Sequence, residues 1–283
     1  MKKEVIYIKD FLNKELEKGL NKKTVNKYAS DLKQFCNFIK FKEDIDIKNL
    51  DHSVIQKNLN MYISYLEKQN YKPSTINGKI IIINKYFKFL EIDCYGKCVK
   101  IQKKIYIDNV ITEGEYKRLL DQCRNNYRDK AIIMTLANTG LRVSELLSLK
   151  IDDVKKINVF VKGKGGKYRE VFLSNQLKNI LKEYIKEYRL NTDNTLLFTG
   201  YRGPLKRQAI NQMLSKYAKK GHISKNKAHP HSLRHLFGKR LAESGVSLDL
   251  IQTYLGHENI STTAIYTKRT KEELERTLEY NFI

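Results

Sequence analysis

The stretch PHSLRHLF, at residues 230–237, places three side chains that can do chemistry close together: His231, Arg234 and His235. Two histidines four residues apart on a helix can bind a metal ion. The arginine between them favours a bound anion instead, because its fixed positive charge would repel a metal cation. The alternative is structural, with Arg234 buried against a carboxylate and both histidines hydrogen-bonded to the backbone.

A helix through this stretch has an apolar side and a polar side. The apolar side carries Leu233, Leu236, Phe237 and Leu241, and the polar side carries His231, Arg234, His235, Gly238 and Ala242. Because glycine and alanine are small, we expect a polar group to approach the cation and the imidazoles closely.

Two further cations lie in settings that suit an anion. Arg142 follows the turn TGL and starts a helix, where backbone N–H groups and the helix dipole favour negative charge. Glu145, at i+3, could orient a neighbouring cation, or form a surface pair of little energetic value. Lys164 lies in KGKGGK, which lacks the Ser or Thr of a Walker loop. Its glycines allow a hairpin tip that can lie against a backbone, and the alternative is an exposed basic turn.

The segment LGHENISTTAIYT, at residues 255–267, adds a histidine and a tyrosine. His257 follows Gly256 at the expected end of a helix, and Tyr266 lies nine residues later, after a turn rich in Ser and Thr. Because the chain has 18 tyrosines, Tyr266 alone indicates nothing.

Taken in order, the blocks TGLRVSEL, GKGGK, PHSLRHLF and LGHENISTTAIYT resemble those of the tyrosine recombinases, of the phage-integrase and Xer type. The residues that match the family's functional positions in type, order and rough spacing are Arg142, Lys164, His231, Arg234, His257 and Tyr266. The resemblance covers residues 112–269 by motif, and residues 1–95 only by the number and position of the helices.

The resemblance implies that Tyr266 attacks a DNA phosphodiester and leaves a 3′-phosphotyrosine and a 5′-hydroxyl, on the way to a Holliday junction. Arg142 and Arg234 would bind the non-bridging oxygens, and Lys164 would protonate the leaving oxygen. The remaining assignments are His231 and His257, which complete the phosphate cage or shuttle a proton; Glu145, which orients the cage; and His235, which at most buttresses the arginine. This chemistry needs no metal, cofactor or ATP.

The partners implied are double-stranded DNA with an inverted-repeat core site and further copies of the chain, as a tetramer on two sites. Thr270 and Glu273 form a possible capping box for a short tail helix whose apolar face includes Leu274 and Leu278. Too little of that helix is apolar for it to be stable alone. It docks on its own catalytic domain or, as the family suggests, on a neighbouring protomer.

Other functions remain open at this stage. A non-catalytic DNA-binding or architectural protein would share the charge but would not need Tyr266. A type IB topoisomerase or a telomere resolvase would use the same chemistry alone. Within the family, the motifs do not separate a Xer-type dimer resolvase from a mobile-element integrase or cointegrate resolvase.

Periodic apolar residues predict the elements that position these groups. In the first part we expect four amphipathic helices: over 3–18, after Thr24, after a Ser53 cap, and from Pro73-Ser74. They form a DNA core-binding domain at 1–95, followed by a linker at 96–110 and a catalytic domain at 111–283. Thr112 and Glu115 predict a capping box at the start of that domain.

The second domain is expected to be mostly helical, with a stop at Gly140 and one hairpin over residues 158–173. The further helices are expected at 175–190, 207–220, 231–244, 247–255, 260–266 and 271–279. The fold class is therefore mainly α with a small antiparallel sheet.

The composition favours a nucleic-acid partner. The formal net charge is +23, and residues 1–107 hold 22 Lys against 12 acidic residues, so the excess is spread along the chain. The first arginine is Arg118, so the forked cations suited to bidentate phosphate contacts all lie in the second part. The four cysteines form no zinc pattern and fit the reduced thiols of a cytoplasmic protein. No secretory signal or membrane span is expected.

Overall fold

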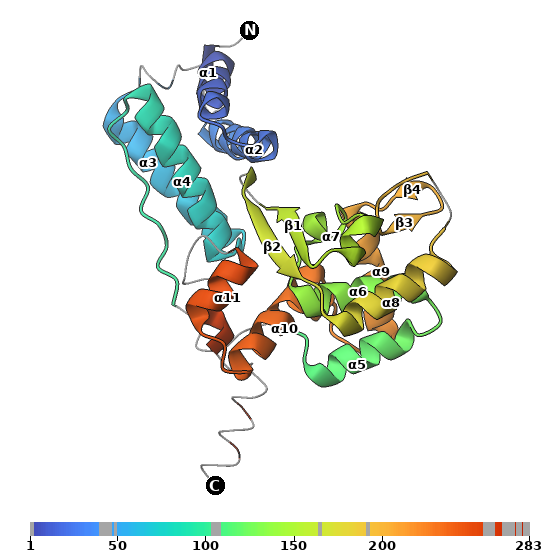
Figure 1. Ribbon diagram of the computed structural model, residues 1–283. Coiled ribbons are helices and arrows are strands. Elements are labelled where there is room, and N and C mark those ends of the chain that lie inside the picture. Colours follow the sequence, from blue (N-terminus) through green and yellow to red (C-terminus); the bar gives the residue numbers. More distant parts are fainter. Residues whose placement is uncertain are drawn as a thin grey trace. The chain divides into compact units, whose positions relative to one another are not determined.

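The computed structural model describes residues 3–39, 47, 50–102, 109–163, 166–190, 193–256, 264–267, 275 and 279. The chain divides into two compact units, Met1–Lys103 and Lys104–Ile283. The described residues are mainly helical, with short antiparallel strand pairs (Figure 1), so the predicted fold class is confirmed. None of the described helices is long and apolar enough to cross a membrane.

The described part of the first unit is built from four amphipathic helices. They are α1 (Lys3–Glu17), α2 (Lys22–Ile39), α3 (His52–Lys68) and α4 (Pro73–Leu90). Side chains at the predicted apolar positions form its core, including Leu32, Phe35, Ile55, Leu59, Tyr62, Leu66, Ile76, Ile80 and Phe87. The helices thus pack through the faces that the 3.6-residue period indicated.

Two predicted helix starts in this unit are wrong. Helix α2 begins at Lys22 and not after Thr24, because the Asn21 side chain accepts the N–H of Lys23 at 2.8 Å. Helix α3 is capped by Asp51 and not by Ser53. The Asp51 carboxylate accepts the N–H of Ser53 at 2.6 Å. At the N-cap position, carboxylate and amide side chains are as effective as hydroxyls. Asn21 and Asp51 precede Thr24 and Ser53 in the chain, so both helices begin earlier than predicted.

Residues 91–102, the described part of the chain that follows α4, form no helix or strand but are held to the unit. The Asn84 side chain pairs with the backbone of Gly96 through two hydrogen bonds of 2.9 Å. The Asn77 side chain pairs in the same way with Val99, at 2.9 and 2.7 Å. This segment therefore lies along α4 at least as far as Val99.

The described part of the second unit contains longer helices, short turns and two strand pairs. The α-helices are α5 (Glu113–Gln122), α6 (Tyr127–Thr139), α7 (Val143–Leu146), α8 (Asn175–Glu183), α9 (Arg207–Lys220), α10 (Pro230–Glu243) and α11 (Leu248–Leu255). The strands are β1 (Asn158–Lys162), β2 (Tyr168–Phe172), β3 (Thr199–Gly200) and β4 (Gly203–Pro204). The turns are η3 (Ile151–Lys155), η5 (Tyr184–Tyr188), η6 (Lys225–Lys227) and η8 (Ala264–Thr267).

Several predictions for this unit are confirmed. Thr112 and Glu115 form the capping box of α5. Helix α6 ends at Gly140, whose φ of +62° is the left-handed conformation that glycine adopts most readily. Strands β1 and β2 form the predicted antiparallel hairpin, with Asn158 opposite Phe172. The helix predicted over 175–190 is present as α8, with its last turn wound as a π-helix over Tyr184–Tyr188.

Helix α6 organises the interior of the second unit. It packs against α10, α7 and α8, and its residues Ile132, Ile133 and Leu136 are fully buried. The helix predicted over 260–266 is described only as the turn η8. The predicted tail helix lies outside the described residues apart from Glu275 and Glu279. The packing of α6, α7 and α10 brings Arg142, His231 and Arg234 together.

Candidate active site

The start of α10 is fixed firmly in the second unit. The ring Nδ1 of His229, the N-cap residue, accepts the N–H of Ser232 at 3.0 Å, and Pro230 occupies the first turn. The Ser232 hydroxyl accepts the N–H of Ile111 and donates to the carbonyl of Asn109. The helix that carries the central motif therefore enters the site at a defined position.

Arg234 is a buried cation, with 1% of its surface exposed. Its guanidinium donates to the backbone carbonyls of Gly140, at 2.7 Å, and Leu255. Burial first, and then the neighbouring cations Arg142 and Arg169, lower the pKa of Arg234 to about 10. It still carries its charge at neutral pH. On the predicted polar side of α10, Arg234 and Gly238 are thus buried while His231 is exposed. The anchors of Arg234 are carbonyls and not the carboxylate of the structural alternative.

Arg142 starts α7, as predicted, and Glu145 holds it there. The Glu145 carboxylate accepts the backbone N–H of Arg142 and, at 2.8 Å, one of its guanidinium nitrogens. A second guanidinium nitrogen donates to the carbonyl of Gly256 at 2.9 Å. The Glu145 side chain is fully buried. Burial alone would raise the pKa of Glu145, but the bonds from Arg169 and Arg142 hold it below its usual value.

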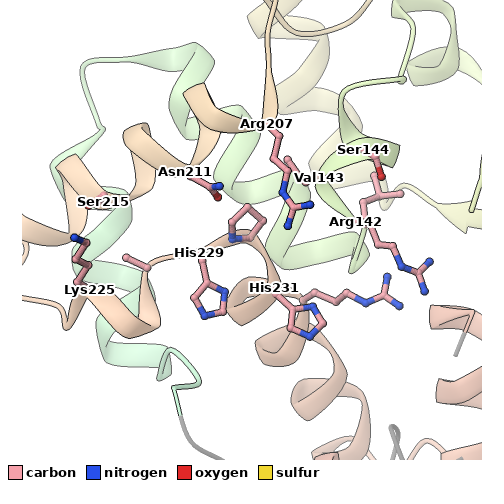
Figure 2. Close-up of a pocket in the computed structure, with 13 residues that line it drawn as sticks. Arg142, Val143, Ser144, Arg207, Asn211, Ser215, Lys225, His229 and His231 are labelled. Atoms are coloured by element: carbon pink, nitrogen blue, oxygen red, sulfur yellow. The ribbon is translucent and has the colours of Figure 1, made fainter. Parts of the chain in front are cut away.

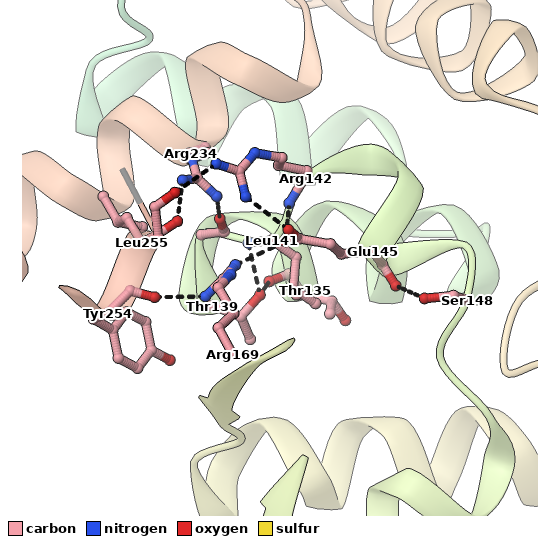
Figure 3. A network of polar contacts seen from close by, with 12 residues as sticks. Thr135, Thr139, Leu141, Arg142, Glu145, Ser148, Arg169, Arg234, Tyr254 and Leu255 are labelled. Atoms are coloured by element: carbon pink, nitrogen blue, oxygen red, sulfur yellow. Dashed lines mark hydrogen bonds and ion pairs between the residues drawn. The ribbon is translucent and has the colours of Figure 1, made fainter. Parts of the chain in front are cut away.

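Arg169 completes the arrangement and was missed by the sequence analysis. Its guanidinium donates to Glu145 at 2.8 Å and to the carbonyl of Tyr254 at 2.6 Å. Consecutive carbonyls at the end of α11, those of residues 254, 255 and 256, therefore each accept a bond from a different arginine (Figure 3). The negative end of the helix dipole and Glu145 offset the repulsion among the three cations.

Lys164 and His257 lie outside the described residues, but the residues just before them are placed. A Cβ on Gly163 would lie 3.8 Å from a guanidinium nitrogen of Arg142, and a Cβ on Gly256 would lie 3.9 Å from the same atom. Gly163, which precedes Lys164, and Gly256, which precedes His257, therefore both lie beside Arg142.

Tyr266, in η8, is packed on α10 with 3% of its surface exposed. A Cβ on Gly238 would lie 2.5–2.7 Å from three carbons of the tyrosine ring, so only glycine leaves room for this packing. Burial raises the pKa of Tyr266 to about 12, and the charges of Arg234 and Arg142 oppose that rise. Gly238, a small residue on the polar side of α10, thus leaves room for the Tyr266 ring.

A pocket of about 460 Å³ opens beside Arg142, His231 and Arg234 (Figure 2). It is lined by Leu141, Arg142, Val143, Ser144, Arg207, Asn211, Ser215, Lys225, Ala228, His229, Pro230, His231 and Arg234. These residues include four permanent cations, two histidines and no carboxylate. Displacement of water from the His231 ring, followed by the charge of Arg234, lowers the pKa of His231, so its imidazole is neutral at pH 7. The pocket suits a phosphate.

Besides Arg169, the sequence analysis missed Arg207, Asn211, Lys225 and His229, whose side chains could bind an anion in the pocket. Arg207 and Asn211 lie one turn apart on α9, while Lys225 and His229 precede α10. A signal was available for Arg169, because alternation places it on the same side of β2 as buried Val171. No local signal marks the other four. Among the described residues, no group of three or more His, Cys, Asp or Glu side chains could hold a metal ion.

Sequence comparison identifies relatives of both units. The profile of the phage integrase family matches residues 109–273. The profile of the phage integrase N-terminal SAM-like domain matches residues 8–92. Together the two profiles span most of the chain.

The similar proteins include tyrosine recombinases from distant organisms. Tyrosine recombinase XerD of Staphylococcus saprophyticus is 34% identical, over 93% of each chain. Tyrosine recombinase XerA of Pyrococcus horikoshii is 33% identical, over 94% of this chain and 89% of the other. A crystal structure of the XerH site-specific recombinase bound to its difH substrate covers 90% of this chain and 78% of its own. Its TM-score is 0.68 at 24% identity, which shows a shared fold.

Proposed function

This chain belongs to the phage integrase family of tyrosine recombinases, and we propose that it recombines DNA through a 3′-phosphotyrosine at Tyr266 and a Holliday junction. Its substrate is double-stranded DNA with an inverted-repeat core site. The match to XerD and XerA over most of their length supports a Xer-type dimer resolvase. Integration or cointegrate resolution by a mobile element would use the same chemistry, and mapping the bound sequence in the native genome separates these roles.

The position of Tyr266 carries this proposal. The ring lies on α10 at Gly238, and the charges of Arg234 and Arg142 act on its hydroxyl. A phenol with a pKa near 10 is a poor nucleophile at neutral pH, so it needs neighbouring cations or a base. Helix α10 contacts Tyr266 and also lines the pocket, whose lining residues include no carboxylate.

The two arginines are the proposed phosphate clamp. Each guanidinium has five N–H donors. Bonds to the carbonyls of Gly140 and Leu255 fix the plane of Arg234. Bonds to Glu145 and the carbonyl of Gly256 fix the plane of Arg142. The donors that remain can bind the non-bridging oxygens, where negative charge collects in the transition state. Glu145 and Arg169 act as positioning residues, because they hold Arg142 and the end of α11.

The roles of Lys164, His231 and His257 complete the proposed mechanism. Lys164 protonates the 5′-oxygen as it leaves, and the two histidines complete the cage around the phosphate. The bond energy stays in the phosphotyrosine ester, so a second strand's 5′-hydroxyl can reverse the step without ATP.

The direct test is covalent capture on a suicide substrate nicked beside the cleavage site. Because guanidinium groups supply the positive charge of the clamp, we expect the adduct to form in EDTA without any nucleotide. Denaturing gels of EDTA-treated and untreated reactions measure this. If a preformed protein–DNA complex cleaves only with added Mg²⁺, the proposed mechanism is wrong.

A second prediction concerns the leaving group. Lys164→Ala should slow cleavage of ordinary DNA by about 10²- to 10⁴-fold, the usual range for general-acid catalysis. A substrate with sulfur in place of the 5′-bridging oxygen needs no proton, so the variant should cleave it at a rate close to that of the wild type. Equal losses on both substrates would leave Lys164 as a phosphate contact only.

The proposed assembly is a tetramer closed by exchange of tail helices between neighbouring protomers. An apolar groove of about 720 Å³ offers a place for such a helix. Its apolar lining comes from β2, α10 and α11 and the residues that follow them, and includes Tyr168, Phe172, Phe237, Leu241, Val246, Leu250, Ile251 and Tyr254.

Truncation before Thr270 should therefore preserve binding to one half-site but remove cooperative loading of the second and synapsis of two sites. Gel shifts on one-site and two-site DNA measure both effects. If the truncated chain loads the second site as cooperatively as the full chain, the tail docks on its own protomer.

A further inference from the structure

His235 has no role in the mechanism above, yet it lies between the pocket and the proposed nucleophile. Its ring meets that of His231 at a centroid distance of 4.2 Å and an angle of 69°. On its other side it meets the Tyr266 ring at 5.6 Å. His231 in turn lies 6.5 Å from His229, and both of these line the pocket. Imidazoles therefore lead from the pocket to the buried tyrosine.

The Tyr266 hydroxyl must lose its proton in order to attack, and burial makes this harder. Few neighbouring groups can take the proton. The guanidinium of Arg234 is already protonated. Glu145 accepts bonds from two arginines, which hold its pKa below the usual value, so it retains a proton poorly. Among the described residues, the imidazole ring in contact with Tyr266 is that of His235.

Arg234 has anchors other than this histidine. The arginine is anchored by the carbonyls of Gly140 and Leu255, which come from other elements of the unit. His235 is half-buried and stands one turn from His231 on the same side of α10. An imidazole is the side chain best suited to gain and lose a proton near neutral pH.

We propose that His235 is a catalytic residue, the general base that accepts the Tyr266 proton. This inference rests on the proposed function. As the bond from the tyrosine oxygen to phosphorus forms, the O–H bond breaks and neutral His235 becomes an imidazolium. The ester bond to the 5′-oxygen breaks, and that oxygen takes its proton from Lys164. His235 then releases its proton through His231 to water in the pocket. In rejoining, His235 returns a proton to the departing tyrosine oxygen.

The test combines His235→Asn with a more acidic nucleophile. Single-turnover adduct formation is measured on the nicked substrate, with tyrosine or 3,5-difluorotyrosine at position 266. With tyrosine, His235→Asn should lose about 10²-fold or more, as expected for loss of a general base. With the fluorinated phenol, which gives up its proton more readily, the loss should shrink at least tenfold. His222→Asn is the matched control, because His222 is an exposed histidine outside the pocket.

Each outcome decides the inference. Wild-type cleavage by His235→Asn would overturn it, as would an equal loss with both phenols, because a packing role does not depend on the acidity of the nucleophile. DNA binding and thermal melting verify that the variant is folded, and His235→Gln serves as the second variant. If the wild-type chain forms no adduct at all, the proposed function fails and the role of His235 falls with it.

Discussion

Tyr266→Phe should abolish the covalent adduct while leaving DNA binding close to that of the wild type. The change removes one oxygen from a ring that is otherwise held by α10 at Gly238, so the packing survives. Without the nucleophile no covalent path remains, and we expect a loss on the order of 10⁴-fold or more. Gel shift and denaturing gel on the same sample separate binding from cleavage.

The matched control is Tyr184→Phe, at another buried tyrosine of the same unit, in η5. It should form the adduct at the wild-type rate. An adduct formed by Tyr266→Phe would show that another side chain attacks the phosphate.

Arg234→Ala should impair both cleavage and stability. It removes a proposed phosphate donor, and loss of one such donor typically costs about 10²- to 10³-fold in rate. It also leaves the carbonyls of Gly140 and Leu255 without their buried donor, which should lower the free energy of unfolding by about 1–3 kcal/mol for each carbonyl. Single-turnover cleavage and thermal melting measure the two losses.

Arg240→Ala is the control for this variant. Arg240 lies on the same helix and pairs with Glu113, and it also donates to the carbonyl of Ala137 at 3.1 Å. Its removal should lower stability without slowing cleavage by the folded protein. Arg234→Lys tests geometry, because an ammonium keeps the charge but cannot hold both carbonyls as a fork does. If Arg234→Ala cleaves bound DNA as fast as the wild type, the clamp does not involve this residue.

Local sequence rules predicted those features that depend on a few neighbouring residues. The capping box at Thr112 and Glu115 and the glycine stop at Gly140 each follow from chemistry within four residues. The same rules failed at Ser53, because the carboxylate of Asp51, two residues earlier, accepts the N–H of Ser53 and so caps the helix first. The presence of a helix is therefore predicted better than the residue that caps it.

The site was predicted in residue type but not in its contacts. A helical wheel reports the two sides of α10 but cannot show that Arg234 and Gly238 on the polar side are buried, because η8 and α11 pack against this helix. The bonds from Arg142 and Arg169 to the end of α11 join segments more than 80 residues apart in sequence. The bonds of Arg169 to Glu145 and to the carbonyl of Tyr254 form only when β2, α7 and α11 are packed together.

The central claim is tested most directly by identifying the atom that carries the DNA. The adduct trapped on nicked substrate is digested, and mass spectrometry locates the modified residue while end labels report which DNA end is joined. The account predicts a nucleotide attached to Tyr266 through the 3′-phosphate, with a 5′-hydroxyl on the released strand. A nucleotide on any other residue, or a linkage through a 5′-phosphate, would contradict it.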